Sequence, residues 1–173
     1  MQIISLLILG SLVGFLLKLA DDISDKNMRL NSIFAMPLGI SYGLLMEYLM
    51  IVDIYAALIF GGIILGCVVS GKINSTGHYF GLAAVLAIVL SYGVKLPPVV
   101  FMIAVLSAFD EMKDIIHIPT LDFLFKYRLF LKTGVLLLVA FNFIGLNGLL
   151  LLFAFDFAYI LTEKLDSRLI HEI

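Results

Sequence analysis

The chain has 173 residues, of which 62% are apolar and only 14% are charged. A soluble protein has roughly 45–50% apolar and about 25% charged residues, so this composition excludes a soluble domain and indicates an integral membrane protein. The net charge of −2 and the single cysteine give no support for nucleic-acid binding or for a disulfide framework.

Seven apolar runs follow one another along the chain, and each is long enough, or nearly so, for a membrane-spanning helix. The first run has no basic segment before it and is followed by Asp21 and Asp22, so we do not interpret it as a cleaved signal peptide. We predict an all-α bundle of about seven transmembrane helices, forming a single domain over residues 1–173. The runs are 3–19, 33–52, 54–70, 79–94, 99–109, 131–144 and 149–161.

The connections between the runs alternate in charge. Those after the second, fourth and sixth runs are short turns at 52–53, 95–98 and 145–148, and Lys95 is the only basic residue among the eleven Lys and Arg that lies on that side. The positive-inside rule relates such an asymmetry to orientation. It predicts that the N-terminus lies outside, that the C-terminus is cytoplasmic and that the number of spans is odd.

Two acidic clusters of the form D-[DE]-x-x-D occur at predicted cytoplasmic ends of runs. The first is DDISD at 21–25, after the first run, and the second is DEMKD at 110–114, after the fifth. An offset of four spans returns the chain to the same side in the same direction, which is how parallel internal repeats are built. The similarity therefore suggests two related halves.

Each cluster has the composition of a Mg²⁺ site. Residues three and four apart share one face of a helix, and grouped carboxylates repel one another unless a cation lies among them. Mg²⁺ takes one or two carboxylates and completes its shell with water and phosphate oxygens. The predicted metal ligands are Asp21, Asp22, Asp25, Asp110, Glu111 and Asp114. A solvated rim of charges at the membrane surface is the alternative interpretation.

Basic side chains accompany the acids on the same side of the predicted bundle. They are suited to hold the phosphate charge that the metal leaves unbalanced. These residues are Lys26, Arg29, Lys72, Lys113, Lys126 and Arg128. The mixed apolar and basic segment at 121–131 is predicted to form an amphipathic helix along the inner interface, covering a site that opens to the cytoplasm. His78 is interpreted as an interfacial anchor.

Two further acids lie inside predicted spans, where an ionisable group is costly and is by default a functional candidate. Glu47 is near the outer end of its span, and we expect it to reach the interface. Asp156 lies deeper, and we expect it to need a partner from another helix or an aqueous cavity. Gly10 and Gly14 form a G-x-x-x-G pair that permits close helix packing.

These motifs resemble those of the UbiA-type intramembrane prenyltransferases. That family has two aspartate-rich motifs on cytoplasmic loops four helices apart, and here residues 22–25 and 110–114 are similar to them. The basic stretch at 26–29, the segment PLGIS at 37–41 and the segment PTL at 119–121 add to the resemblance. The family has about nine helices, so seven spans imply the loss of the first and last.

The resemblance implies Mg²⁺-dependent transfer of a prenyl group from a polyprenyl diphosphate to a small or lipid acceptor. It assigns Asp22, Asp25, Asp110 and Asp114 as the main catalytic ligands, at a site facing the cytoplasm. Two alternatives remain open. The first is a CDP-alcohol or phosphoglycosyl phosphotransferase, which also uses paired aspartates, and the second is a cation or proton-coupled transporter that uses Glu47 and Asp156.

Overall fold

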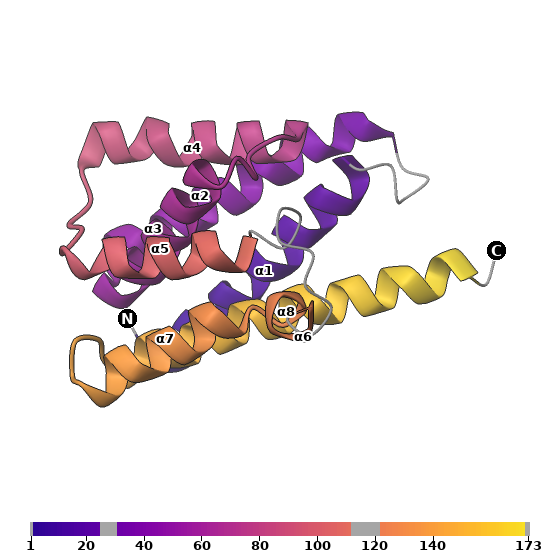
Figure 1. The fold of residues 1–173 in the computed structure, drawn as a ribbon. Coiled ribbons are helices and arrows are strands. Elements are labelled where there is room, and N and C mark those ends of the chain that lie inside the picture. The colour runs from indigo at the N-terminus through magenta and orange to yellow at the C-terminus, as the bar shows by residue number, and fades with distance from the viewer. Residues whose placement is uncertain (1, 25–30, 112–121, 172–173) are drawn as a thin grey trace.

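The regular structure of the described chain is helical, as the sequence predicts (Figure 1). The computed structural model describes residues 2–24, 31–111 and 122–171. The main helices are α1 (Ile3–Ser24), α2 (Ala35–Val52), α3 (Ile54–Val69), α4 (Thr76–Tyr92), α5 (Val99–Glu111), α7 (Leu129–Ala140) and α8 (Leu146–His171). A short 3-10 turn, η1 (Ser32–Phe34), precedes α2, and a short helix, α6 (Asp122–Lys126), precedes α7.

Three of the described helices are long and apolar enough to cross a membrane. They are α1, α2 and the Leu146–Leu165 part of α8. The apolar helices α3, α4, α5 and α7 have between 12 and 17 residues. At 1.5 Å per residue these helices extend about 18–26 Å, which is less than the hydrocarbon core of about 30 Å. The structure therefore supports a membrane protein with at least three candidate spans.

Helix boundaries follow local hydrogen bonding. Only Asp53 separates α2 from α3, and its Oδ1 accepts hydrogen bonds from the backbone N–H groups of Tyr55 at 2.9 Å and Ala56 at 3.1 Å. A carboxylate at this position satisfies the free N–H groups of the first helical turn. By contrast, the turn predicted at 145–148 is displaced, because α8 already begins at Leu146 and the chain reverses over residues 141–145.

The predicted amphipathic helix over 121–131 is wrong in one respect, because it is interrupted. Arg128 has a left-handed backbone conformation (φ 48°) between α6 and α7. Such a conformation is uncommon for a residue other than glycine. The interruption turns the start of α7 towards the end of α5. There the Asp110 carboxylate accepts hydrogen bonds from the first backbone N–H groups of α7.

Glycines mediate the three closest helix pairings, α1 with α8, α2 with α4 and α3 with α5. A Cβ atom on Gly14 would lie 2.1 Å from the carbonyl oxygen of Phe155, and one on Gly39 would lie 2.3 Å from that of Gly77. On α3, a Cβ on Gly62 would lie 2.4 Å from the side chain of Ile103. Small residues let membrane helices pack backbone to backbone, so these glycines permit the close approach within each pair.

Replacing Gly39 by Ala is expected to destabilise the protein by about 1–3 kcal/mol, because the added methyl meets a backbone carbonyl that cannot rotate away. Gly61→Ala is the matched control, since its Cβ would lie 3.0 Å from the end of the flexible Leu96 side chain. The measurement is the thermal unfolding midpoint in lipid nanodiscs. Equal midpoints for the two variants would contradict the close α2–α4 contact.

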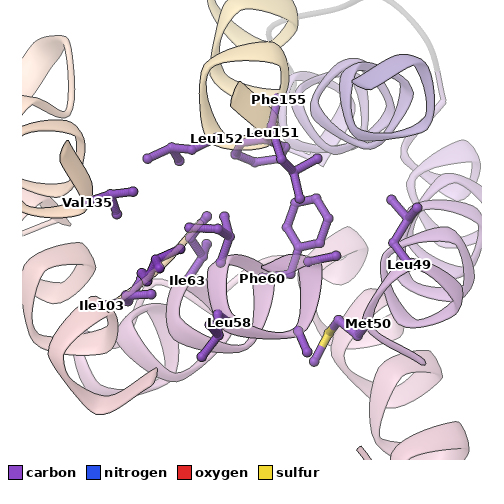
Figure 2. Close-up of a cluster of buried hydrophobic side chains, with 14 of the residues drawn as sticks. Leu49, Met50, Leu58, Phe60, Ile63, Ile103, Val135, Leu151, Leu152 and Phe155 are labelled. Carbon is purple, nitrogen blue, oxygen red and sulfur yellow. The ribbon is translucent and has the colours of Figure 1, made fainter. Parts of the chain in front are cut away.

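The apolar core lies between α3 and α8, with contributions from α2, α5 and α7 (Figure 2). At its centre, Phe60 and Phe155 meet edge to face with ring centroids 5.6 Å apart. Leu49, Ile103 and Val135 belong to the same cluster, and all five side chains are fully buried. This packing fixes α8 against the rest of the bundle and so fixes the position of Tyr159, one turn beyond Phe155.

Candidate active site

A cavity of about 720 Å³ lies among α1 to α5, the α6–α7 segment and α8. Part of its wall is apolar and includes Leu17, Met46, Ile63, Val85 and Phe155. Another part is charged. The acidic and basic residues there, including histidine, are Lys18, Asp21, Lys72, His78, Asp110, Glu111, Arg128 and Glu163. Acids of both predicted clusters therefore face one cavity that has both polar and apolar walls.

The two aspartates of the first cluster have different surroundings. Asp22 is buried and forms an ion pair with Lys18, one helical turn earlier, at 2.9 Å between Oδ1 and Nζ. Asp21 lines the cavity, where its Oδ2 accepts a hydrogen bond from the Tyr159 hydroxyl at 3.3 Å and its Oδ1 lies 3.6 Å from Nε2 of His78. Asp21, rather than Asp22, is thus the carboxylate of this pair that a ligand in the cavity can reach.

The second cluster is anchored to the start of α7. Asp110 accepts hydrogen bonds from the backbone N–H groups of Phe130 at 3.1 Å and Leu131 at 2.7 Å. It therefore caps a helix that begins about twenty residues later in the chain, satisfying N–H groups that have no partner within that helix. Glu111 lies next to it and pairs with Arg128 at 2.9 Å. These contacts hold the α6–α7 segment over the end of α5.

The environment of Asp110, one residue past the apolar run at 99–109, changes its ionisation. Burial raises the pKa of this carboxyl to about 6, while the backbone N–H groups of Leu131 and Phe130 and the charge of Arg128 act in the opposite direction. A carboxyl with a raised pKa holds its proton more tightly in the folded than in the unfolded state. Its contribution to stability is therefore full below pH 3.8 and is lost as the pH rises through about 6.

We expect the free energy of unfolding to fall by about 2–3 kcal/mol between pH 4 and pH 7 on account of Asp110. Asp110→Asn removes this titration, so the variant should show a correspondingly flatter pH dependence, whatever its absolute stability. The measurement is chemical unfolding in detergent with EDTA present at both pH values. Parallel pH profiles for the wild type and the variant would show that Asp110 does not titrate in this range.

Tyr159 of α8 joins the two clusters in space. Its ring lies under two cations: Nζ of Lys18 is 5.3 Å from the ring centroid, and the guanidinium carbon of Arg128 is 4.8 Å from it. The hydroxyl of the same ring donates to Asp21. Lys18 and Tyr159 are site residues that the sequence motifs did not identify. His78, which the sequence analysis interprets as an interfacial anchor, also lines the cavity.

The remaining predicted site residues divide into two groups. Lys72 and Arg128 line the cavity together with Asp21, Asp110 and Glu111. The other predicted residues lie outside the part of the chain that the structure describes. They are Asp25, Lys26, Arg29, Lys113 and Asp114, and for Lys126 the side chain alone.

The carboxylates that face the cavity have the right chemistry for Mg²⁺. Within the described ranges, no three His, Cys, Asp or Glu side chains converge in a preformed metal site. Mg²⁺ usually needs only one or two protein carboxylates and takes its other oxygens from water and phosphate. A carboxylate also accepts about four hydrogen bonds or metal contacts in total. Asp21, Asp110 and Glu111 line the same cavity, and their carboxylate groups are of the kind that such a site uses.

The two acids within spans behave differently from each other. Asp156 forms an ion pair with Lys132 of α7, which supplies the partner from another helix that its position in the sequence predicts. Glu47 is fully buried, and neither carboxylate oxygen has a hydrogen-bond partner among the described residues. The expectation that Glu47 reaches the interface is therefore wrong, because the close contact of α2 with α4 encloses this part of the helix.

Comparison with known proteins identifies no family for this chain: no protein-family model, no curated protein and no solved structure matches it.

Proposed function

We propose that the protein is an intramembrane enzyme that uses Mg²⁺ to transfer a prenyl group from a polyprenyl diphosphate to a small or lipid acceptor. The observation that supports this proposal best is the convergence of the two acidic clusters on one cavity. Asp21 comes from the end of α1, and Asp110 and Glu111 come from the end of α5. Basic and apolar side chains share the same cavity, so it suits an amphiphile with an anionic head.

The charged wall is suited to the diphosphate. Asp21, Asp110 and Glu111 would hold Mg²⁺, and Lys72 and Arg128 would bind phosphate oxygens that the metal does not reach. When bound, Mg²⁺ neutralises the charge that develops on the departing diphosphate. The protein contributes by holding the head group at one wall of the cavity and by excluding water from the carbon that reacts.

The apolar wall is suited to the isoprenoid chain. Met46, Ile63 and Phe155 line the cavity and also belong to the buried core. They offer the head-proximal part of a prenyl chain a surface without hydrogen-bonding groups. An apolar chain gains about 25 cal/mol for each Å² that it removes from water, so this wall would favour prenyl diphosphates over free inorganic diphosphate.

We also propose the membrane orientation that the charge distribution predicts, with seven spans, the N-terminus outside and the C-terminus in the cytoplasm. The N-terminus and the α4–α5 and α7–α8 connections lie at one end of the bundle, and the C-terminus lies at the other (Figure 1). Asp21 and Asp22 lie in the last turn of α1, and Asp110 and Glu111 lie in the last turn of α5. In this orientation the cavity takes its substrate from the cytoplasmic side.

The test is a turnover assay of the full chain in nanodiscs, with radiolabelled farnesyl diphosphate as donor and a total membrane lipid extract as the source of acceptors. We expect Mg²⁺-dependent release of inorganic diphosphate, together with transfer of the label to a lipid-soluble product, and loss of both with EDTA. Release of CMP from a CDP-alcohol, with no reaction of farnesyl diphosphate, would overturn the proposal in favour of a phosphotransferase.

A further inference from the structure

The Tyr159 ring lies between residues of the two acidic clusters and has a cation from each side of the site against it. Lys18 comes from α1 and lies 5.3 Å from the ring centroid, and Arg128 comes from the α6–α7 connection and lies 4.8 Å from it. The interaction of a cation with an aromatic face is electrostatic and strengthens where water is excluded. Lys18 and Arg128 line the cavity together with Tyr159.

Each of these cations also forms an ion pair with a carboxylate, in addition to its contact with the Tyr159 ring. Lys18 pairs with Asp22 at 2.9 Å and lies 3.9 Å from Oδ2 of Asp21, and Arg128 pairs with Glu111 at 2.9 Å. An ammonium group has three N–H donors and a guanidinium group has five, which is more than these pairs use. Lys18 and Arg128 can therefore donate to a ligand without leaving their present partners.

We propose that Lys18 and Arg128 form a diphosphate-binding pair and that Tyr159 is the positioning residue that sets their relative placement. This inference rests on the proposed function, because it assigns the head group of the same substrate to these residues. A diphosphate has two phosphoryl groups, and the two cations reach the cavity at one ring, Lys18 from α1 and Arg128 from the α6–α7 connection. Each cation binds one phosphoryl group, and Lys18 adds a contact that no sequence motif indicated.

The hydroxyl and the ring of Tyr159 have separable roles in this arrangement. The hydroxyl donates to Asp21, whereas the ring face contacts the cations. Tyr159→Phe keeps the ring and is expected to weaken diphosphate binding less than the loss of the ring does. Tyr159→Leu removes the ring and is expected to weaken binding, because both cations then lose the surface that positions them.

The experiment is calorimetric titration of the full chain in nanodiscs with inorganic diphosphate and with farnesyl diphosphate, in the presence of Mg²⁺. Lys18→Gln removes the charge but still offers Asp22 a hydrogen bond, and it should weaken binding of both ligands by about 10- to 100-fold. Lys18→Arg should restore most of the affinity. Lys95→Gln, in the exposed α4–α5 connection, is the matched loss of a positive charge away from the cavity and should change nothing.

The steady-state parameters distinguish positioning from a structural role. For Lys18→Gln and Tyr159→Leu we expect KM for farnesyl diphosphate to rise more than kcat falls. Wild-type affinity in both variants, or wild-type KM with intact turnover, overturns the inference and leaves the proposed function standing. Weakened diphosphate binding in a protein that does not transfer prenyl groups supports the inference and overturns the function. Absence of diphosphate binding by the wild type overturns both.

Discussion

Replacing Asp21 by Asn is expected to lower Mg²⁺-dependent turnover of a prenyl diphosphate by about 10²–10³-fold. Asp21 is the carboxylate of the first cluster that lines the cavity among the described residues. Asparagine keeps an oxygen that can accept the hydrogen bond from Tyr159, but it removes the negative charge that would hold the metal. The variant should therefore fold like the wild type and lose activity, with partial recovery at higher Mg²⁺ concentrations.

Asp53→Asn is the matched control for this substitution. It also replaces one aspartate by asparagine, but Asp53 caps α3 in the connection after α2, and asparagine is an equally good N-cap. Its turnover and its Mg²⁺ dependence should equal those of the wild type. Full activity of Asp21→Asn at low Mg²⁺ would remove this residue from the site. Asp110→Asn is a poorer test, because that change also weakens the cap of α7.

The helical class follows directly from the composition, and the sharp reversal at Asp53 follows from one polar residue between two apolar runs. The break at Arg128 has no such local signal, because it accompanies hydrogen bonds from the N-terminus of α7 to Asp110, which is distant in the sequence. The helix pairings also lie beyond the sequence pattern. Gly39 and Gly77 meet only because two helices distant in the chain pack together, and neither residue carries information about the other.

The site shows the same division between local and long-range information. The spacing of charges within DDISD and DEMKD is enough by itself to make Asp21 and Asp110 candidate ligands. Lys18 is not predicted as a site residue, because it lies within an apolar run and outside both acidic motifs. Its spacing of four residues from Asp22 is nevertheless that of a helical ion pair. Tyr159 has no comparable signal, because its partners come from α1 and from the α6–α7 connection.

Replacing Lys132 by Met is expected to destabilise the protein by about 3–5 kcal/mol, the largest stability effect that we predict. Lys132 of α7 pairs with Asp156 of α8, and it also donates to the carbonyl oxygen of Tyr127 at 2.6 Å. The Asp156 side chain is only 3% exposed. Removing the lysine leaves a buried carboxylate without its counter-ion. The thermal unfolding midpoint in nanodiscs should fall by roughly 10 °C.

The double variant Lys132→Met/Asp156→Leu determines whether the loss comes from the unpaired charge of Asp156 or from the missing hydrogen bond to Tyr127. Methionine retains much of the length of the stem, and leucine is close to aspartate in shape without its charge. Because an apolar pair avoids the cost of removing two charges from water, the double variant should recover most of the lost stability. If the double variant were as unstable as Lys132→Met alone, then the hydrogen bond to Tyr127, rather than the ion pair, would hold α7 in place. Retained prenyl turnover in the stable double variant would show that prenyl transfer does not require a titratable group at Asp156.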